Sequence, residues 1–167
     1  MTSGGYLLIE AMVAMGVLTT AVFGIFALMS QSIKLTRVID DQYVGTYLAA
    51  EGIELAKNLF DANIPPIGPG PWNANGFDVD RCYELDIDTT SLNSAVSVGC
   101  PTGSVRPLGF DGAFYRYIPG NSTAYTRTVH IEPIVDGAQT GIQVVSTVKW
   151  ASGVSSVSLE DKFYNWH

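Results

Sequence analysis

The chain has 167 residues and a mass of 17.9 kDa, which fits one compact domain. Hydrophobic residues make up 47% of it and charged residues only 15%, and a single charged residue, Glu10, precedes Lys34. This segregation excludes an ordinary cytosolic enzyme and an intrinsically disordered chain. The net charge of −7 argues against a dedicated nucleic-acid binder, because phosphate contacts need a basic surface.

The first predicted element is a membrane-spanning helix over residues 6–30. Tyr6–Met29 reads YLLIEAMVAMGVLTTAVFGIFALM, and as a helix this run is about 36 Å long, enough to span a hydrocarbon core of about 30 Å. A secretory signal peptide fits poorly, since the basic n-region is missing and the apolar run is too long. A plain membrane anchor would fit the length but leaves Glu10 unexplained, because a carboxylate in an apolar helix is costly.

The start of this helix carries a family resemblance. The segment from Gly5 to Glu10 reads GYLLIE and resembles the processing site of type IV prepilins and of the related pseudopilins of type II secretion. The resemblance implies a leader peptide over residues 1–5, removed by cleavage between Gly5 and Tyr6, and N-methylation of Tyr6. Tyr6 replaces the usual Phe or Met, and the leader lacks the family's usual basic residue.

The resemblance also implies a role for Glu10, which would be the fifth residue of the processed chain. In that family the glutamate pairs with the N-terminal amine of a neighbouring subunit. Both charges are costly when alone in an apolar helix bundle, so pairing would fix the register of assembly. The alternative is that Glu10 only reaches out to the membrane interface.

The function implied is a structural subunit of a type IV pilus or pseudopilus, not an enzyme, with no cofactor. Its partners would be other pilin or pseudopilin subunits, a prepilin peptidase and methyltransferase, an inner-membrane assembly platform, and membrane lipid before assembly. It would lie in a bacterial inner membrane with its C-terminal domain outside, then in a cell-surface pilus or periplasmic pseudopilus. The resemblance is closer to minor pilins and pseudopilins than to major pilins.

The alternative function is a membrane-anchored extracytoplasmic domain for ligand binding or adhesion. Its binding surface would use exposed aromatic side chains such as Tyr115, Tyr117 and Trp150.

An amphipathic continuation of the helix is predicted over residues 31–62, which lack proline. Apolar residues recur there at steps of three and four and predict the face that packs on the domain. A Pro- and Gly-rich loop over residues 63–76 ends the helix near Asp61–Asn63, and Trp72 is expected to pin this loop to the domain. The predicted packing face consists of Ile39, Tyr43, Tyr47, Ala50, Ile53 and Ala56.

The rest of the chain, residues 77–167, is predicted to form a β domain. Strand patterns occur at 83–88, 113–118, 125–132, 143–150 and 156–159, and the last three form an antiparallel meander with turns at Asp136-Gly137 and Ser152-Gly153. The predicted class is α+β, a long N-terminal helix packed on a small antiparallel sheet. This is also the pilin fold that the resemblance implies.

Cys82 and Cys100 are the only cysteines, and in an exported domain they are expected to form a disulfide. The alternative is two reduced thiols, and two cysteines alone do not make a zinc site. The segment Asn73–Asp80 faintly resembles a calcium loop, but its order departs from the EF-hand pattern, so a turn is the simpler interpretation. No metal site and no catalytic motif is predicted.

Overall fold

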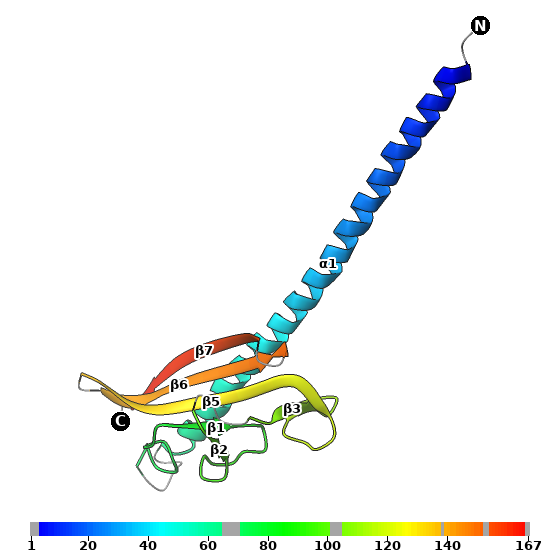
Figure 1. Cartoon of the computed structure of the whole chain (residues 1–167). Coiled ribbons are helices and arrows are strands. Elements are labelled where there is room, and N and C mark those ends of the chain that lie inside the picture. The colour runs from blue at the N-terminus through cyan, green and yellow to red at the C-terminus, as the bar shows by residue number, and fades with distance from the viewer. Residues whose placement is uncertain (1–3, 65–70, 101–104, 138, 152–153, 166–167) are drawn as a thin grey trace. The chain divides into compact units, whose positions relative to one another are not determined.

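The computed structural model describes residues 4–64, 71–100, 105–137, 139–151 and 154–165. It contains one helix, α1 (Gly4–Asp61), and seven strands within these ranges (Figure 1). The chain divides into two units, Met1–Asp40 and Asp41–His167, so the second unit includes the last part of the helix as well as the sheet. The predicted α+β class, with a long N-terminal helix packed on an antiparallel sheet, is confirmed.

The helix ends at Asp61, as the sequence predicts. The Asn63 N–H donates to the Phe60 carbonyl at 2.9 Å, which closes the last turn. The Asn63 side-chain amide donates to the Ala74 carbonyl at 3.0 Å, so it ties the helix end to the chain that returns from the loop. Most of the proline-rich loop, residues 65–70, lies outside the described residues.

All strand pairs are antiparallel, and β5 is the central strand. One edge of β5 pairs with β1 and β3, and its other edge pairs with β6, which pairs in turn with β7. The meander of three long strands is confirmed, as is the Gly137 turn, whereas the predicted Ser152-Gly153 turn lies outside the described residues. The predicted strands 83–88 and 113–118 are strand only at 83–84 and 115–116, and the short strands β2 and β3 were not predicted. The strands are β1 (Arg81–Glu84), β2 (Val96–Val98), β3 (Pro107–Phe110), β4 (Tyr115–Arg116), β5 (Ser122–Asp136), β6 (Gln139–Trp150) and β7 (Ser155–Tyr164).

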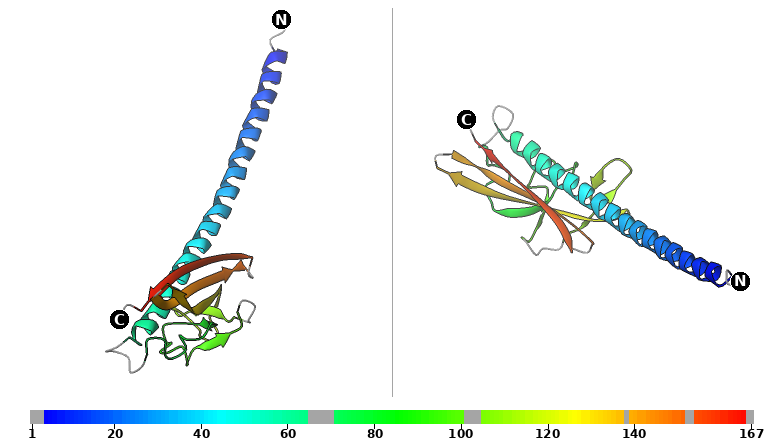
Figure 2. Two further views of the ribbon diagram at one scale, coloured as in Figure 1. Left: turned by 90° about the vertical axis from the view of Figure 1, so that its left-hand side faces the viewer. Right: turned by 90° about the horizontal axis from the view of Figure 1, so that it is seen from above.

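Alternation along β5 and β6 separates a buried face from an outer face. Val129 and Ile131 of β5 and Val144 and Val148 of β6 are fully buried between the sheet and the Asp41–Asp61 part of the helix. Figure 2 shows these strands lying across that part of α1. The outer face carries the intervening residues, mostly polar, including His130.

The helix turns a partly different side to the sheet from the one predicted. Tyr43, Tyr47 and Ala50 are exposed, whereas Gly45, Leu48, Ala49, Gly52 and Ala56 are buried. The predicted face was right for Ile53 and Ala56, which pack in the core. It was wrong for the tyrosines because it followed the large apolar side chains. Small residues let the helix backbone approach the sheet: a Cβ added at Gly45 would lie 2.7 Å from the Trp150 ring.

Two apolar clusters hold the helix to the sheet. The first joins Phe60 to strands β1, β5 and β6, and Trp72 packs on Phe60 with ring centroids 5.8 Å apart. The second joins Leu48 and Ala49 to Leu108, Val148 and Trp150. The predicted pinning of the loop by Trp72 is confirmed.

Strand β7 lies at the edge of the sheet. Among the described residues it pairs only with β6, so one row of its backbone groups faces outward. Three consecutive charged residues, Glu160, Asp161 and Lys162, are exposed in this strand. Charged side chains are a common device by which natural edge strands avoid pairing with other chains.

Candidate functional site

The first candidate site is the N-terminal part of the helix. Every described side chain from Tyr6 to Tyr43 is exposed, although most of those before Lys34 are apolar. Burying a Leu, Ile, Phe or Met side chain contributes about 1.5–3 kcal/mol, so this surface strongly favours an apolar environment. By length and composition the helix can cross a membrane and serve as an anchor, a test that a signal sequence also passes.

The predicted processing and assembly residues lie in the first turns of α1. Gly5 is its second residue, and Tyr6, with 81% of its surface exposed, follows directly. Glu10 lies one turn later and is exposed. Within the described part of the chain its carboxylate makes no hydrogen bond or ion pair. In an apolar environment this charge would need a partner from outside that part of the chain.

The two threonine hydroxyls of the apolar segment are satisfied within the helix. Thr19 donates to the Met15 carbonyl at 2.9 Å, and Thr20 donates to the Gly16 carbonyl at 2.7 Å. Such bonds to the preceding turn remove the need for an external partner. Glu10 is thus the only charged side chain between Tyr6 and Met29, and no hydrogen bond or ion pair meets its charge within the described residues.

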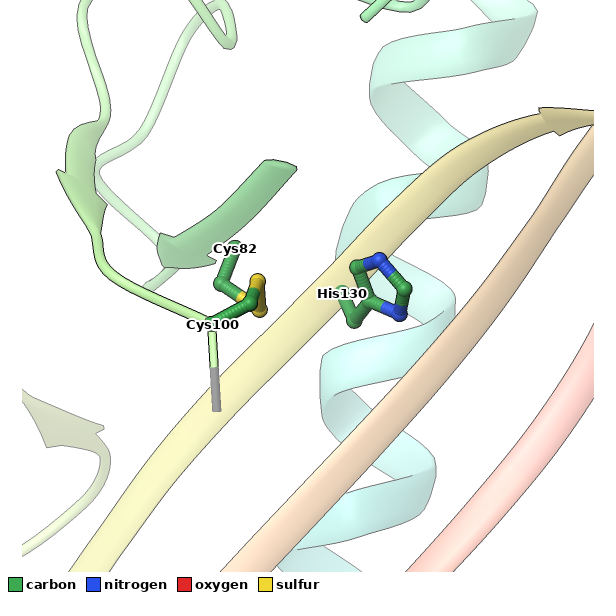
Figure 3. A group of neighbouring side chains, drawn as sticks. All are labelled: Cys82, Cys100 and His130. Carbon is green, nitrogen blue, oxygen red and sulfur yellow. A yellow bond between two sulfur atoms is a disulfide. The ribbon is translucent and has the colours of Figure 1, made fainter. Parts of the chain in front are cut away.

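The second candidate site is the disulfide, which the sequence predicted. Cys82 and Cys100 are joined, with their Cα atoms 5.5 Å apart (Figure 3). Cys82 lies in β1 and is buried, whereas Cys100 follows β2 and is exposed. The bond closes the segment that contains β2 and the turns between Asp86 and Ala95, where regular structure is sparse.

His130 lies on the same outer face as the disulfide. The strand register pairs it with Cys82, and Nε2 of His130 lies 2.6 Å from Oδ1 of Asp80. The sequence gave no signal for this arrangement beyond alternation in β5, because the β1–β5 pairing is long-range. Two groups of potential metal ligands occur among the described residues, and both include His130. Neither is formed within the turn predicted at Asn73–Asp80, although Asp80 belongs to one of them.

A buried arginine joins the helix to the sheet. Arg127 of β5 is fully buried, and its guanidinium donates to the Leu48 carbonyl at 3.1 Å and to the Leu85 carbonyl at 2.6 Å. Its Nη1 also lies 3.1 Å from a carboxylate oxygen of Glu51. The sequence pattern placed Arg127 on the apolar face of its strand but gave no reason for a charge there. The structure supplies the reason: it holds helix and sheet together.

A second polar group surrounds Tyr117. The buried carboxylate of Glu84 accepts from the Arg106 backbone N–H at 2.7 Å and from Arg106 Nε at 2.6 Å, and the guanidinium of Arg106 lies over the Tyr117 ring. The Tyr117 hydroxyl donates to the Arg127 carbonyl at 3.1 Å. Burial raises the pKa of Tyr117 well above its usual range. These groups are structural in geometry, since each is satisfied by its neighbours.

The aromatic residues expected to form an exposed binding surface are only partly available. Trp150 is 9% exposed and packs in the second apolar cluster, so its expected exposure was wrong. Tyr117 and Tyr115 are half-buried. Tyr115 instead borders a groove of about 420 Å³ beside the helix, together with Tyr47, Glu51, Glu54 and Phe114.

Comparisons with known proteins returned no family: no protein-family model, curated protein or solved structure matches this chain. The architecture, a long apolar N-terminal helix on a small antiparallel sheet, fits a pilin-like arrangement. Any finer assignment depends on the residues themselves.

Proposed function

We propose that this chain is a structural subunit of a type IV pilus or of a type II secretion pseudopilus. It is inserted in a bacterial inner membrane, cut between Gly5 and Tyr6 by a prepilin peptidase, N-methylated at Tyr6 and assembled through its N-terminal helix. Glu10 pairs with the N-terminal amine of a neighbouring subunit. It acts as a building unit and not as an enzyme, and it stays on the outside of the membrane as part of a filament.

One observation carries this proposal: the exposed and otherwise apolar stretch Tyr6–Met29 contains one carboxylate, Glu10, which is the fifth residue after the predicted cleavage point. A second copy of the chain would supply an apolar surface for this stretch to pack against and a positively charged N-terminal amine to pair with Glu10. A carboxylate left without its partner in an apolar environment costs about 3–5 kcal/mol. An incoming subunit that fails to form the pair is therefore held weakly.

The test replaces Glu10 in the native host and measures how much of the chain enters sheared filaments or crosslinked assemblies. Glu10→Val is expected to abolish incorporation while the protein stays in the membrane. Thr20→Val is the matched control, since it also removes a polar group from the same helix and is expected to assemble normally. Normal assembly of the Glu10→Val variant would overturn the pairing mechanism.

Processing is tested by the mass of the N-terminal peptide from protein purified out of its native membrane. A chain beginning at Tyr6, with or without one methyl group, is expected. Gly5→Val is expected to block cleavage, whereas Gly4→Ala is expected to leave it intact. A wild-type chain that retains residues 1–5 in a host with active prepilin peptidase would contradict the proposal.

A second candidate is a membrane-anchored domain for ligand binding or adhesion. The groove beside Tyr47, Glu54 and Phe114 favours it, because it offers aromatic surface next to carboxylates. The Glu10 test separates the two functions, since an anchored binding domain tolerates Glu10→Val but loses ligand when the groove is altered by Phe114→Ala.

A further inference from the structure

The outer face of the sheet brings two sulfur atoms and one imidazole together. The β1–β5 register places Cys82 opposite His130, and the disulfide adds Cys100 from the chain that follows β2. One ligand atom from each of the three side chains lies within 4.8 Å of those from the other two. Figure 3 draws the disulfide beside β5 and the imidazole of His130 over this strand.

We propose that the reduced chain binds one thiophilic divalent cation, such as Zn²⁺, through Cys82, Cys100 and His130, and that the disulfide excludes this ion. Two thiolates and an imidazole are a donor set that zinc prefers. With zinc–ligand bonds of about 2.0–2.3 Å, tetrahedral donors lie about 3.5–4 Å apart. The three side chains therefore need only small movements once the sulfur–sulfur bond is broken.

The surroundings suit an ion. A metal-bound imidazole commonly has its second ring nitrogen held by a carboxylate, which fixes the orientation of the ring. Asp80 lies 2.6 Å from Nε2 of His130, so it would hold the ring in this way when Nδ1 binds the ion. A cavity of about 290 Å³ opens beside the disulfide, between Thr128 and Lys149, and gives an ion access from solvent. Asp80 is a positioning residue in this arrangement.

Metal binding requires free thiols, so in the oxidised protein the disulfide must first be reduced. A phosphine breaks the Sγ–Sγ bond by giving up two electrons; it leaves as the phosphine oxide with the oxygen of one water molecule, whose two protons end on the thiols. The cation then replaces these two protons, so binding releases two protons per ion. In the cell no reductant is needed, because the chain is made with free thiols. Bound metal would delay disulfide formation until the ion is lost.

The experiment uses the full chain in detergent micelles, reduced with a phosphine under anaerobic conditions and titrated with Co²⁺. Thiolate-to-cobalt charge transfer and tetrahedral visible bands, saturating at one ion per chain, are expected, and Zn²⁺ should displace the cobalt. His130→Ala is expected to weaken Co²⁺ binding at least about 10-fold, the loss that even an orienting neighbour of a ligand gives. The oxidised chain should show no such bands.

Glu132→Gln is the matched control, because Glu132 lies two residues along the same face of β5 and is expected to leave the affinity unchanged. Circular dichroism of the oxidised His130→Ala protein checks that the variant folds. Absence of charge-transfer bands in the reduced wild-type chain would overturn the proposal. The proposal would also be overturned if the oxidised chain bound cobalt and Glu132→Gln abolished that binding. The site would then be the surface group of Asp80, His130 and Glu132.

Discussion

The two parts of α1, before and after Asp41, differ in what covers them. From Tyr6 to Asp40 the described side chains are exposed, whereas between Val44 and Phe60 one side of the helix is buried against the sheet. Both parts contain glycine, but nothing lies within 4 Å of a Cβ added at Gly16 or Gly24, and a Cβ added at Gly52 would collide with Ser146 Oγ. Glycine therefore marks close packing in one part only.

This difference shows where each part finds its partner. The later part is complete within the chain, because the sheet buries its small residues and Arg127 reaches across to its backbone. The earlier part has apolar surface that nothing in the described residues covers, and under the proposed function lipid or another copy of the chain would cover it. Substitutions at the packed contacts of the later part should therefore lower the free energy of unfolding, whereas matched substitutions in the earlier part should leave it nearly unchanged.

The largest effect is expected from Arg127→Met. This change leaves the carbonyls of Leu48 and Leu85 without their donor and Glu51 without its counter-charge. Removing one partner of a buried ion pair costs about 3–5 kcal/mol, and chemical unfolding followed by tryptophan fluorescence measures it. Arg37→Met in the exposed part is the control and should stay within about 0.5 kcal/mol of wild type. Equal free energies of unfolding for the two variants would contradict the view that only the later part of α1 is packed within the chain.

Loss of the disulfide should come next. Cys82 and Cys100 are 18 residues apart in sequence, and a loop of that size contributes about 3 kcal/mol in the chain-entropy model. The Cys82→Ser/Cys100→Ser variant should unfold at a lower denaturant concentration, with its free energy of unfolding reduced by about 3 kcal/mol. The helicity of the part before Asp41 should be unchanged. A loss of that helicity at the same denaturant concentration would mean that the two parts unfold together.

Gly52→Ala is expected to have a smaller effect than either. The added methyl group meets Ser146 Oγ and lies 3.1 Å from Cδ of Arg127, and overpacking of this kind costs about 1–3 kcal/mol. Gly24→Ala is the matched control and should be neutral or stabilising by up to about 1 kcal/mol through helix propensity. Thermal unfolding by circular dichroism compares them. A destabilising Gly24→Ala would reveal packing in the exposed part.

The smallest effect is a pH dependence from Tyr117. Its pKa is raised by burial, so above about pH 10 the unfolded chain loses this proton while the folded chain keeps it. Stability should therefore fall as pH rises above about 10, and Tyr117→Phe should make that fall shallower. Tyr47→Phe, at an exposed position of the helix, is the control. Denaturant midpoints between about pH 9 and pH 11 test it, and identical slopes in both variants would exclude this role for Tyr117.

The sequence predicted those parts of the fold that depend on local periodicity. The long strands β5 and β7 were found because their residues alternate in polarity, and β6 was found because it is rich in β-branched residues. The helix end was found because prolines follow it. The packed side of the helix was predicted only in part, at Ile53 and Ala56, since the rest of that side is defined by small residues such as Gly45 and Gly52, which carry little hydrophobicity. The short strands β2 and β3 have no pattern and form only because neighbours far along the chain pair with them.

The candidate sites were predictable to different extents. The disulfide followed from cysteine count and the expectation of export. Glu10 was visible as the only charge in an apolar run, although its partner remains a proposal. His130, Asp80 and the role of Arg127 were not predictable, because their neighbours come from strands and helix turns that lie 42 to 79 residues away in the sequence.

The charged edge strand has a consequence for crowding. Under the proposed anchoring, many copies of the domain share one membrane surface, so their local concentration far exceeds that of a dilute solution. An open strand edge in such a layer would join sheets from different copies into a continuous ribbon. Glu160, Asp161 and Lys162 oppose this, because each new strand would have to desolvate three charges. The domains can then be packed densely and still separate.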